Sequence, residues 1–570
     1  MLRHRFLSYS TELNITHFRQ DAMSQPCLAR VIPKAIMLEA QRRSFTSWSP
    51  VVLRCLILAA VLLAADPCIF AASADAGIQA IVGLIRQGRL PEAHARLLDA
   101  VKKNPDSPAL YRLLGIVCQR EKKFAEAREA LQKGVNLTGG KDPQLLFLLC
   151  QIEFTLKNRA EALRLANQVS VMKNANPMTH YSLGLLMLNN TCPHDAVSEL
   201  EKAQKLAPQN PAITTELIVA FLNDNNRQRA GELMTGFFKH ASYDDLVQAG
   251  SRFGDAGHFA AATRAFRRAL QINPDAYDAA FDLAFATYRQ GKLAQALAIL
   301  DTMDPRTTPG QWDYHYLRGK IEMGLHHAQI ATAEMLKAFS LQPNNETLCS
   351  DTGLLLFHFE KFWEALKVYQ TCSGHLPDSM PIATGLGLTY FRLGKYEDAI
   401  RTFRSVLAAQ PVADAAREAL GFLLYIEGNL DEASRLLEGR MSGKNVDFYV
   451  YYLDALVLLR LHPIGDHADA LRSLDEALHK NPAFAPAWFE RARILADGGN
   501  SAQALTDLLR ATKANPSYAQ PYYLMAKIDY KLGKKKDAEQ ARLRFVALNR
   551  AREEKEQEQQ VENQLLQALR

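Results

Sequence analysis

The stretch Met380–Pro411 decides the fold, and it reads MPIATGLGLTYFRLGKYEDAIRTFRSVLAAQP. Positions 5, 8, 12 and 24 residues before Pro411 hold Val406, Phe403, Ala399 and Gly387. The same offsets before four other prolines hold a small residue, a large apolar residue, an alanine and a glycine: Cys372, Tyr369, Ala365 and Gly353 before Pro377; Ala338, Met335, Ala331 and Gly319 before Pro343; Ala269, Phe266, Ala262 and Gly250 before Pro274; Ala203, Leu200, Ala196 and Gly184 before Pro208. Agreement in five copies indicates an internal repeat. A repeat with this period is typical of a repeat architecture, so we interpret the fold from the repeat first.

Each copy of the repeat predicts two helices. Residues that share a face of the first helix are Ala383, Leu386, Gly387 and Tyr390. Residues that form the apolar stripe of the second are Tyr396, Ala399, Ile400, Phe403, Val406 and Leu407. Gly394 is expected to end the first helix, and Pro411 the second. Small residues at Gly387 and Ala399 let the two backbones approach. Because one hairpin cannot bury its apolar face alone, neighbouring hairpins must stack.

The pattern resembles the tetratricopeptide repeat family. The resemblance implies an all-α fold, a helical-hairpin solenoid in which helix pairs form a right-handed superhelix. Residues 74–549 span 476 residues, or fourteen units of 34. The units from Pro143 and Pro211 match the pattern weakly, and Leu461–Asp466 predicts a widened turn. Residues 550–570 are mostly charged or Gln and are interpreted as a polar capping helix or tail.

Residues 1–74 lack the repeat and are interpreted as a leader with an unstructured N-terminal part. Arg42-Arg43 precedes the apolar run Val51–Ala65 and the small residues Ala72-Ser73-Ala74, the layout of an export signal. A cut after Ala74 starts the mature chain where the repeats begin. We therefore expect export to the periplasm or cell envelope, with Met37 as a candidate for the true start.

The alternative is a membrane anchor formed by residues 51–74. Val51–Ala65 has only fifteen residues and contains Arg54, whereas a spanning helix needs about 20 apolar residues. The sequence leaves an uncleaved, membrane-tethered chain open as the second hypothesis.

The charge of the repeat region argues against a nucleic-acid partner. The chain has a net charge of +6, and residues 1–74 contribute +4 of it, which leaves +2 for residues 75–570. A nucleic-acid binder needs a basic surface, and none is evident in the repeats.

The cysteines suggest packing rather than chemistry. Cys118, Cys150 and Cys372 occupy core positions of their units and are expected to be small buried hydrophobic residues. Cys192 falls in a predicted turn and is expected to be an exposed thiol. No CxxC pair and no zinc-ligand spacing occurs, so no metal is expected.

Catalytic motifs are absent, so the sequence predicts neither an enzyme nor a cofactor. His326 and His327, and also His462 and His467, fall in predicted turns and are interpreted as solvated residues. An enzyme would need a site built from loops such as Leu461–Asp466, and we consider that hypothesis the weakest.

The first helices carry the candidate binding residues. In the resembling family these helices line the concave side of the solenoid, and aromatic residues recur there: Phe281, Phe285, Tyr288, Tyr316, Phe422, Tyr425, Phe489, Tyr523 and Tyr530. Polar residues are interleaved with them: Arg112, Gln151, Asn223, Lys320, Arg493 and Lys527. One interpretation is a groove that binds a protein or peptide segment through aromatic anchors. The other is that these rings pack against the next helix inside the solenoid.

Together these observations predict a non-catalytic, exported repeat scaffold that binds a protein or peptide segment in its concave groove. A membrane-tethered adaptor in an envelope or polysaccharide-export complex is the alternative.

Overall fold

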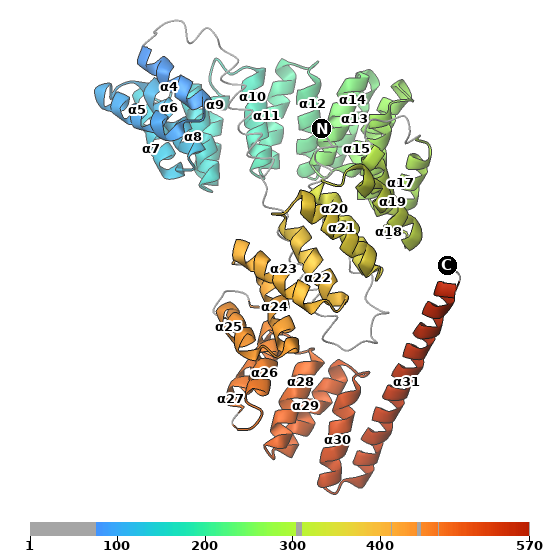
Figure 1. The fold of residues 1–570 in the computed structure, drawn as a ribbon. Coiled ribbons are helices and arrows are strands. Elements are labelled where there is room, and N and C mark those ends of the chain that lie inside the picture. The colour runs from blue at the N-terminus through green and yellow to red at the C-terminus, as the bar shows by residue number, and fades with distance from the viewer. Residues whose placement is uncertain (1–75, 304–310, 412, 442–445, 466, 569–570) are drawn as a thin grey trace. The chain divides into compact units, whose positions relative to one another are not determined.

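The structure is a computed structural model that describes residues 76–303, 311–411, 413–441, 446–465 and 467–568 (Figure 1). These residues form 28 helices, and no strand occurs among them. The predicted all-α fold of stacked helical hairpins is confirmed. The predicted leader, with its apolar run and cut site, lies outside the described residues. Among those that are described, no helix is both long enough and apolar enough to cross a membrane.

The chain divides into two compact units, each a series of helix pairs. The first holds α4 (Ala76–Arg86), α5 (Leu90–Lys103), α6 (Pro108–Arg120), α7 (Phe124–Leu137), α8 (Pro143–Thr155), α9 (Arg159–Ser170), α10 (Pro177–Asn189), α11 (Pro193–Leu206), α12 (Pro211–Asn223), α13 (Arg227–His240), α14 (Tyr243–Asp255), α15 (Phe259–Ile272), α16 (Tyr277–Arg289) and α17 (Leu293–Asp301). The second holds α18 (Gln311–Gly324), α19 (Ala328–Leu341), α20 (Glu346–His358), α21 (Phe362–His375), α22 (Met380–Arg392), α23 (Tyr396–Ala409), α24 (Asp414–Glu427), α25 (Leu430–Met441), α26 (Phe448–Leu461), α27 (Ala468–Lys480), α28 (Ala485–Asp497), α29 (Ser501–Ala514), α30 (Ala519–Lys531) and α31 (Lys535–Ala568).

The helix pair α22–α23 follows the sequence pattern closely. Its first helix ends at Arg392, and Gly394 adopts the left-handed conformation with φ of 72°. The second helix runs from Tyr396 to Ala409, two residues before Pro411. The two sequence-weak units also form helix pairs, α8–α9 and α12–α13, so a poor match to the pattern does not interrupt the array.

Two places differ in detail from the regular unit. The segment between α26 and α27 is widened as predicted, and Ile464 in it is 92% exposed. At the C-terminal end, α31 runs without a break from Lys535 to Ala568, so the last repeat helix and the predicted capping helix are one helix (Figure 1).

A close contact between a glycine and a large side chain closes seven of the hairpins. A Cβ atom added to the glycine would lie 2.4 to 3.1 Å from the partner side chain in these pairs: Gly115–Leu131, Gly184–Leu200, Gly250–Phe266, Gly319–Met335, Gly353–Tyr369, Gly387–Phe403 and Gly421–Leu437. Real Cβ atoms essentially never approach other atoms more closely than 3.0 Å. In these seven hairpins glycine fits this place because the partner side chain occupies the space that a methyl group would need.

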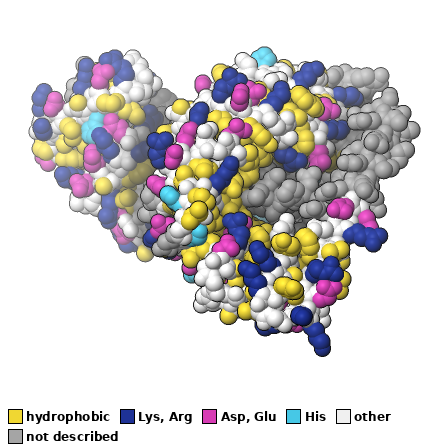
Figure 2. Space-filling view, turned by 60° about the horizontal axis from the view of Figure 1, so that its bottom comes forward, with side chains coloured by type: hydrophobic (Ala, Val, Ile, Leu, Met, Phe, Trp, Pro, Cys, Tyr) yellow, Lys and Arg dark blue, Asp and Glu magenta, His cyan; other side chains and the backbone are white. Residues whose placement is uncertain are grey.

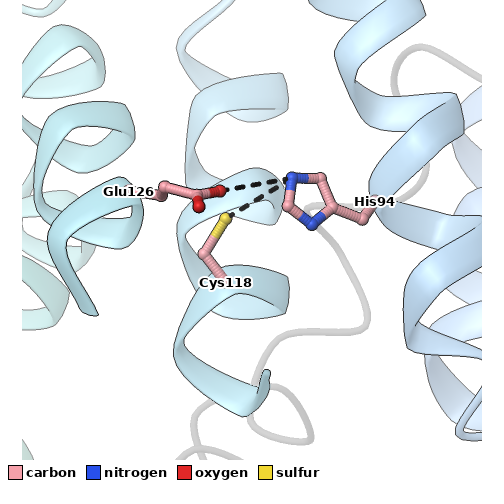
Figure 3. A group of neighbouring side chains, drawn as sticks. All are labelled: His94, Cys118 and Glu126. Atoms are coloured by element: carbon pink, nitrogen blue, oxygen red, sulfur yellow. Dashed lines mark hydrogen bonds and ion pairs between the residues drawn. The ribbon is translucent and has the colours of Figure 1, made fainter. Parts of the chain in front are cut away.

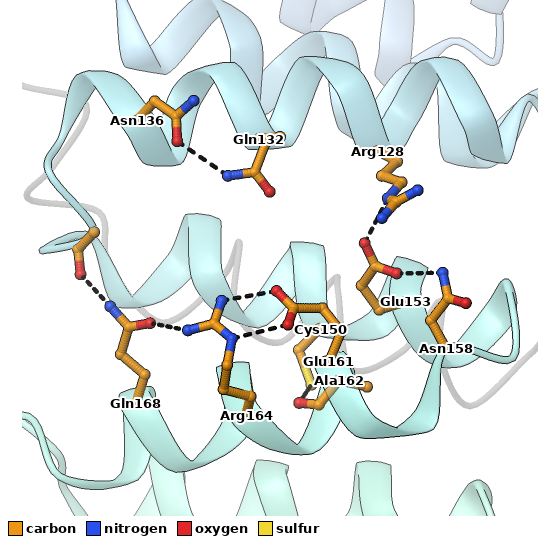
Figure 4. Close-up of polar contacts among 11 residues, drawn as sticks. Arg128, Gln132, Asn136, Cys150, Glu153, Asn158, Glu161, Ala162, Arg164 and Gln168 are labelled. Carbon is orange, nitrogen blue, oxygen red and sulfur yellow. Dashed lines mark hydrogen bonds and ion pairs between the residues drawn. The ribbon is translucent and has the colours of Figure 1, made fainter.

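Polar side chains join successive hairpins near the N-terminal end of the first unit (Figure 4). The guanidinium of Arg128 on α7 donates to Glu153 on α8 over 2.7 Å, and Asn158 donates to the other carboxylate oxygen over 2.7 Å. Gln168 on α9 donates across to the carbonyl oxygen of Gly140. Glu153 is 1% exposed, and these partners supply the hydrogen bonds that a buried carboxylate needs.

An arginine at the end of several first helices reaches back to the preceding hairpin. Arg120 donates to the carbonyl of Ile85, and Arg460 donates to the carbonyl of Tyr425 over 2.6 Å. Arg392 lies over the ring of Phe362 at 4.4 Å. The cation satisfies carbonyl groups left open at a helix C-terminus and covers an aromatic face.

One cysteine prediction is wrong, and a second is right about burial but did not include the disulfide that the residue forms. Cys192 is fully buried rather than exposed, because its side chain turns inward at the start of α11 and donates to the carbonyl of Asn190. Cys372 is buried as predicted, but it forms a disulfide with Cys349, so it is not a free thiol. Cys118 and Cys150 are free and buried, as predicted.

The left-handed position of the turn within each hairpin is held by a non-glycine residue in six hairpins: Lys122, Lys157, Thr191, Asn225, His326 and Glu360. Gly394 holds the same place in α22–α23. A side chain in this conformation costs about 1 kcal/mol relative to glycine.

We expect Gly250→Ala to lower the free energy of unfolding by about 1–3 kcal/mol, because the added methyl group overlaps the Phe266 ring. Gly236→Ala is the matched control: Gly236 is an exposed helical glycine with no atom within 4 Å of an added Cβ. The control should be neutral or stabilising by up to about 1 kcal/mol. Chemical denaturation of both variants measures the difference, and equal effects would contradict the contact.

We expect Lys157→Gly to raise the free energy of unfolding by up to about 1 kcal/mol, because Lys157 has φ of 64° and glycine removes that strain. Thermal unfolding measures the change. The control is Lys133→Gly in the interior of α7, which should destabilise by about 1 kcal/mol. A loss of stability in Lys157→Gly would contradict the interpretation.

Candidate protein-binding face

The first-helix face is the side of the first helices that carries the nine predicted aromatic residues. The structure places them on five helices: Phe281, Phe285 and Tyr288 on α16; Tyr316 on α18; Phe422 and Tyr425 on α24; Phe489 on α28; Tyr523 and Tyr530 on α30. Of these helices, α16 belongs to the first compact unit and the other four to the second.

On α16 the aromatic side chains are mostly packed. Phe281 is 2% exposed and Phe285 6% exposed, whereas Tyr288 is half-buried. The ring of Phe281 stacks on Tyr277, with centroids 6.2 Å apart. The Arg289 guanidinium lies 5.9 Å from the Phe285 ring centre.

On α18 the aromatic residue belongs to a buried polar network. Tyr316 is fully buried, and its hydroxyl donates to a carboxylate oxygen of Asp351 on α20 over 2.5 Å. Lys320 donates to the same oxygen over 3.1 Å, and its ammonium lies 5.8 Å from the Tyr316 ring centre. These contacts tie two successive first helices together.

On α24 the two rings contact neighbouring hairpins. Phe422 is buried and meets Phe391 of α22 edge to face, with centroids 5.8 Å apart. Tyr425 is half-buried beneath Arg460 of α26, which lies 5.4 Å from its ring centre.

On α28 and α30 the aromatic residues become accessible. Phe489 is half-buried and packs edge to face with Tyr518. Tyr523 is 59% exposed, with its ring 5.3 Å from that of Phe545 on α31. Tyr530 is 72% exposed. Of the nine predicted residues, these two tyrosines present the most aromatic surface to solvent.

The nine residues therefore divide between packing and exposure. Phe281, Phe285, Tyr316 and Phe422 pack inside the solenoid, and Tyr523 and Tyr530 do not. Binding of a ligand by the set stays a prediction. The sequence pattern places all nine on one side of the first helices, but the neighbouring helix decides which rings are covered.

Basic residues lie on α30, which carries the exposed tyrosines, and on the neighbouring first helix α28. Lys527 is exposed on α30 between Tyr523 and Tyr530. Arg493 on α28 is about half exposed and pairs with Glu490 over 2.8 Å. Burial raises the pKa of the Glu490 carboxyl, and the Arg493 charge opposes that rise. Figure 2 shows basic and acidic side chains mixed over the visible face, with hydrophobic patches between them.

Two predictions about histidines meet different outcomes. His326 lies in a turn, as predicted, with φ of 66°. His327 is not merely solvated: its Nδ1 lies 2.7 Å from a carboxylate oxygen of Glu322, which is 2% exposed. His462 and His467 flank the widened segment between α26 and α27.

Sequence reasoning missed a cluster of side chains in the first unit. His94 on α5, Cys118 on α6 and Glu126 on α7 turn toward one another (Figure 3). Their separations of 24 and 8 residues match no metal motif. Alignment of successive units could have found them, because the second helix of one hairpin packs against the first helix of the next.

The architecture defines an all-α repeat protein built from helical hairpins. Models of the tetratricopeptide repeat family match residues 81–145, 255–321, 384–438 and 464–519. These regions of the chain are tetratricopeptide repeats.

Several known proteins resemble parts of the chain. Intraflagellar transport protein 70B of Bos taurus is 27% identical over 214 residues, which are 38% of this chain. The match spans only 28% of that bovine protein. The crystal structure of the APC/C hetero-tetramer Cut9–Hcn1 is 13% identical, covers 79% of this chain and 95% of its own, and has a TM-score of 0.34. A tetratricopeptide repeat protein from Parabacteroides merdae is 17% identical, covers 42% and 93% respectively, and has a TM-score of 0.32.

Repeats of this type indicate a coarse function. Tetratricopeptide repeat proteins are generally scaffolds that bind protein partners and are typically non-catalytic.

Proposed function

We propose that the chain is a non-catalytic scaffold, exported to the periplasm or cell envelope, that binds an extended protein segment along α28 and α30. The observation that carries the proposal is the exposure of Tyr523 and Tyr530 on a first helix, because the other seven aromatic residues of the same face are buried or half-buried.

The spacing of the two tyrosines suits a linear ligand. They lie seven residues apart on α30, which places them on one side of the helix, about 10 Å apart along its axis. Phe489 on the neighbouring first helix extends the aromatic surface. Tyrosine is enriched among the residues that dominate binding energy at protein interfaces, because it combines a large apolar ring with a hydroxyl group.

The charges around this surface specify the partner's chemistry. Lys527 is exposed between the two tyrosines, and Lys531 follows at the end of α30. A segment with apolar or aromatic side chains to contact the rings, and acidic side chains to meet these ammonium groups, complements the surface.

The disulfide supports the proposed location. Cys349 on α20 and Cys372 on α21 join the two helices of one hairpin, with Cα atoms 6.0 Å apart and both residues buried. Disulfides persist in oxidising compartments and are rare in the cytosol. This bond and the export-like pattern of residues 51–74 are independent features that favour the same location.

The alternative function is a tethered adaptor in an envelope complex. The apolar run Val51–Ala65 motivates it: residues 51–74, if uncleaved, would be the anchor, although the run is shorter than the about 20 residues that a spanning helix needs.

We expect Tyr530→Ala and Tyr523→Ala each to weaken binding to short synthetic peptides that combine acidic and aromatic residues, by about tenfold or more. Fluorescence anisotropy with the full chain measures the affinity. Trp363→Ala is the matched control, because Trp363 is 63% exposed on the second helix α21, away from the first-helix face. Charge-reversed peptides should bind more weakly. Equal losses in the control, or no preference for acidic peptides, would refute the proposed surface.

We expect mass spectrometry of the natively expressed protein to show a mature N-terminus near Asp75 and a peptide in which Cys349 is linked to Cys372. The sample is fractionated, and thiols are blocked before lysis to prevent later oxidation. An intact leader in the membrane fraction, with the disulfide formed, would favour the tethered adaptor. Reduced cysteines in a cytoplasmic protein would exclude both locations.

A further inference from the structure

Three potential metal ligands meet between the first two complete hairpins of the first unit. The Nε2 atom of His94 lies 3.9 Å from the Cys118 sulfur and 3.7 Å from a carboxylate oxygen of Glu126. One ligand atom from each residue lies within 4.8 Å of the other two. The three side chains come from α5, α6 and α7, and they converge on one point (Figure 3).

The donor atoms and their separations suit a zinc-class divalent ion. Zinc binds thiolate sulfur at about 2.3 Å and imidazole nitrogen or carboxylate oxygen at about 2.0–2.2 Å in tetrahedral geometry. That geometry puts neighbouring donor atoms about 3.3–3.6 Å apart. The two distances to the His94 nitrogen exceed this range by only a few tenths of an ångström, and the exposed Glu126 side chain can move to close the remaining gap.

A second carboxylate fixes the imidazole for this role. The Nδ1 atom of His94 lies 2.5 Å from a carboxylate oxygen of Glu121. With the Nδ1 atom hydrogen-bonded to Glu121, the Nε2 lone pair faces Cys118 and Glu126. Metal-binding histidines commonly have such a carboxylate on the other ring nitrogen.

Burial and charge agree with this arrangement. His94 is 8% exposed and Cys118 1% exposed, whereas the Glu126 side chain is 57% exposed and leaves a path from solvent. With Cys118 as thiolate, the charges of Cys118, Glu121, Glu126 and Lys123 sum to −2, which a divalent cation neutralises. The Lys123 ammonium lies 3.0 Å from Glu121 and 3.4 Å from the His94 Nδ1 atom, on the side away from the metal-binding nitrogen.

A catalytic cysteine is the rival interpretation, since the Cys118 thiol lies beside the His94 imidazole, which in turn lies beside a carboxylate. The burial of Cys118 argues against it. A nucleophilic cysteine is accessible to its substrate, whereas Cys118 is 1% exposed.

We propose that His94, Cys118 and Glu126 bind one zinc-class divalent ion, with Glu121 as a positioning residue and a water molecule as fourth ligand. On binding, the Cys118 thiol releases its proton to solvent and the thiolate coordinates the ion. The ion would join α5 to α6 and α7, and so tie two successive hairpins together.

The test is a titration of the full-length reduced protein with Co²⁺, followed by competition with Zn²⁺. We expect one equivalent of Co²⁺ to produce a near-ultraviolet thiolate-to-cobalt band that Zn²⁺ abolishes, and the band to be missing in Cys118→Ser. Zn²⁺ should also raise the melting temperature of the wild type but not of this variant. Cys150→Ser is the control for the loss of a different buried cysteine, because the Cys150 sulfur donates to the carbonyl of Ala162 rather than to a histidine. This variant should keep the band.

Two surface variants keep the test decisive if Cys118→Ser folds poorly. Glu126→Gln should lower the affinity for Co²⁺ at least tenfold. Glu129→Gln, which changes an exposed residue on the same helix, should leave that affinity unchanged. Glu121→Gln should lower the affinity for Co²⁺ by about 10–100-fold but should leave the thiolate-to-cobalt band in place, as expected of a positioning residue. A thiolate band that survives in Cys118→Ser, no thiolate band in the wild type, or equal affinities in Glu126→Gln and Glu129→Gln would overturn the proposal.

Discussion

The contact between a glycine of the first helix and a large residue of the second sets the distance between the two helices of a hairpin. Ring atoms of Phe266, Tyr369 and Phe403 occupy the space that a methyl group would fill on the facing glycine. In α16–α17 the corresponding pair is Ala284 and Leu300, both fully buried, so a slightly larger residue faces a smaller partner. A phenylalanine or tyrosine ring thus faces only a glycine, whereas the alanine faces the smaller leucine, and the interior stays close-packed in both cases.

Because the geometry of a hairpin is fixed, it determines which side chains each hairpin presents to the next one. Stacked first helices cover one another's side chains. Tyr316 and Lys320, for example, donate hydrogen bonds to Asp351 of the next first helix, so these polar groups are occupied within the protein. Exposed aromatic surface survives where packing is incomplete, as at Tyr523 and Tyr530 on α30. A binding surface on such a solenoid is thus the part of the first-helix face that the neighbouring helices leave uncovered.

The sequence predicts the fold well because helix periodicity, turn residues and the repeat all act locally. The ends of α22 and α23 follow directly from Gly394 and Pro411. Contacts between hairpins are harder to predict, since they depend on which side chains from different units meet. The division of the aromatic residues into packed and exposed sets depends on such contacts. The bond between Cys349 and Cys372 and the burial of Cys192 depend on how side chains turn within a single hairpin, which the repeat pattern does not specify either.

The central claim is that the glycine and its large partner together set the distance between the two helices of a hairpin. A double-mutant cycle at Gly387 and Phe403 tests this claim most directly. The double variant Gly387→Ala/Phe403→Leu installs the alanine–leucine pair found at Ala284 and Leu300. Chemical denaturation of the wild type, both single variants and the double variant gives the coupling free energy. We predict that the double variant is more stable than the summed single effects imply, by about 1 kcal/mol or more. Additive losses would show that the two residues do not constrain one another and would contradict this account.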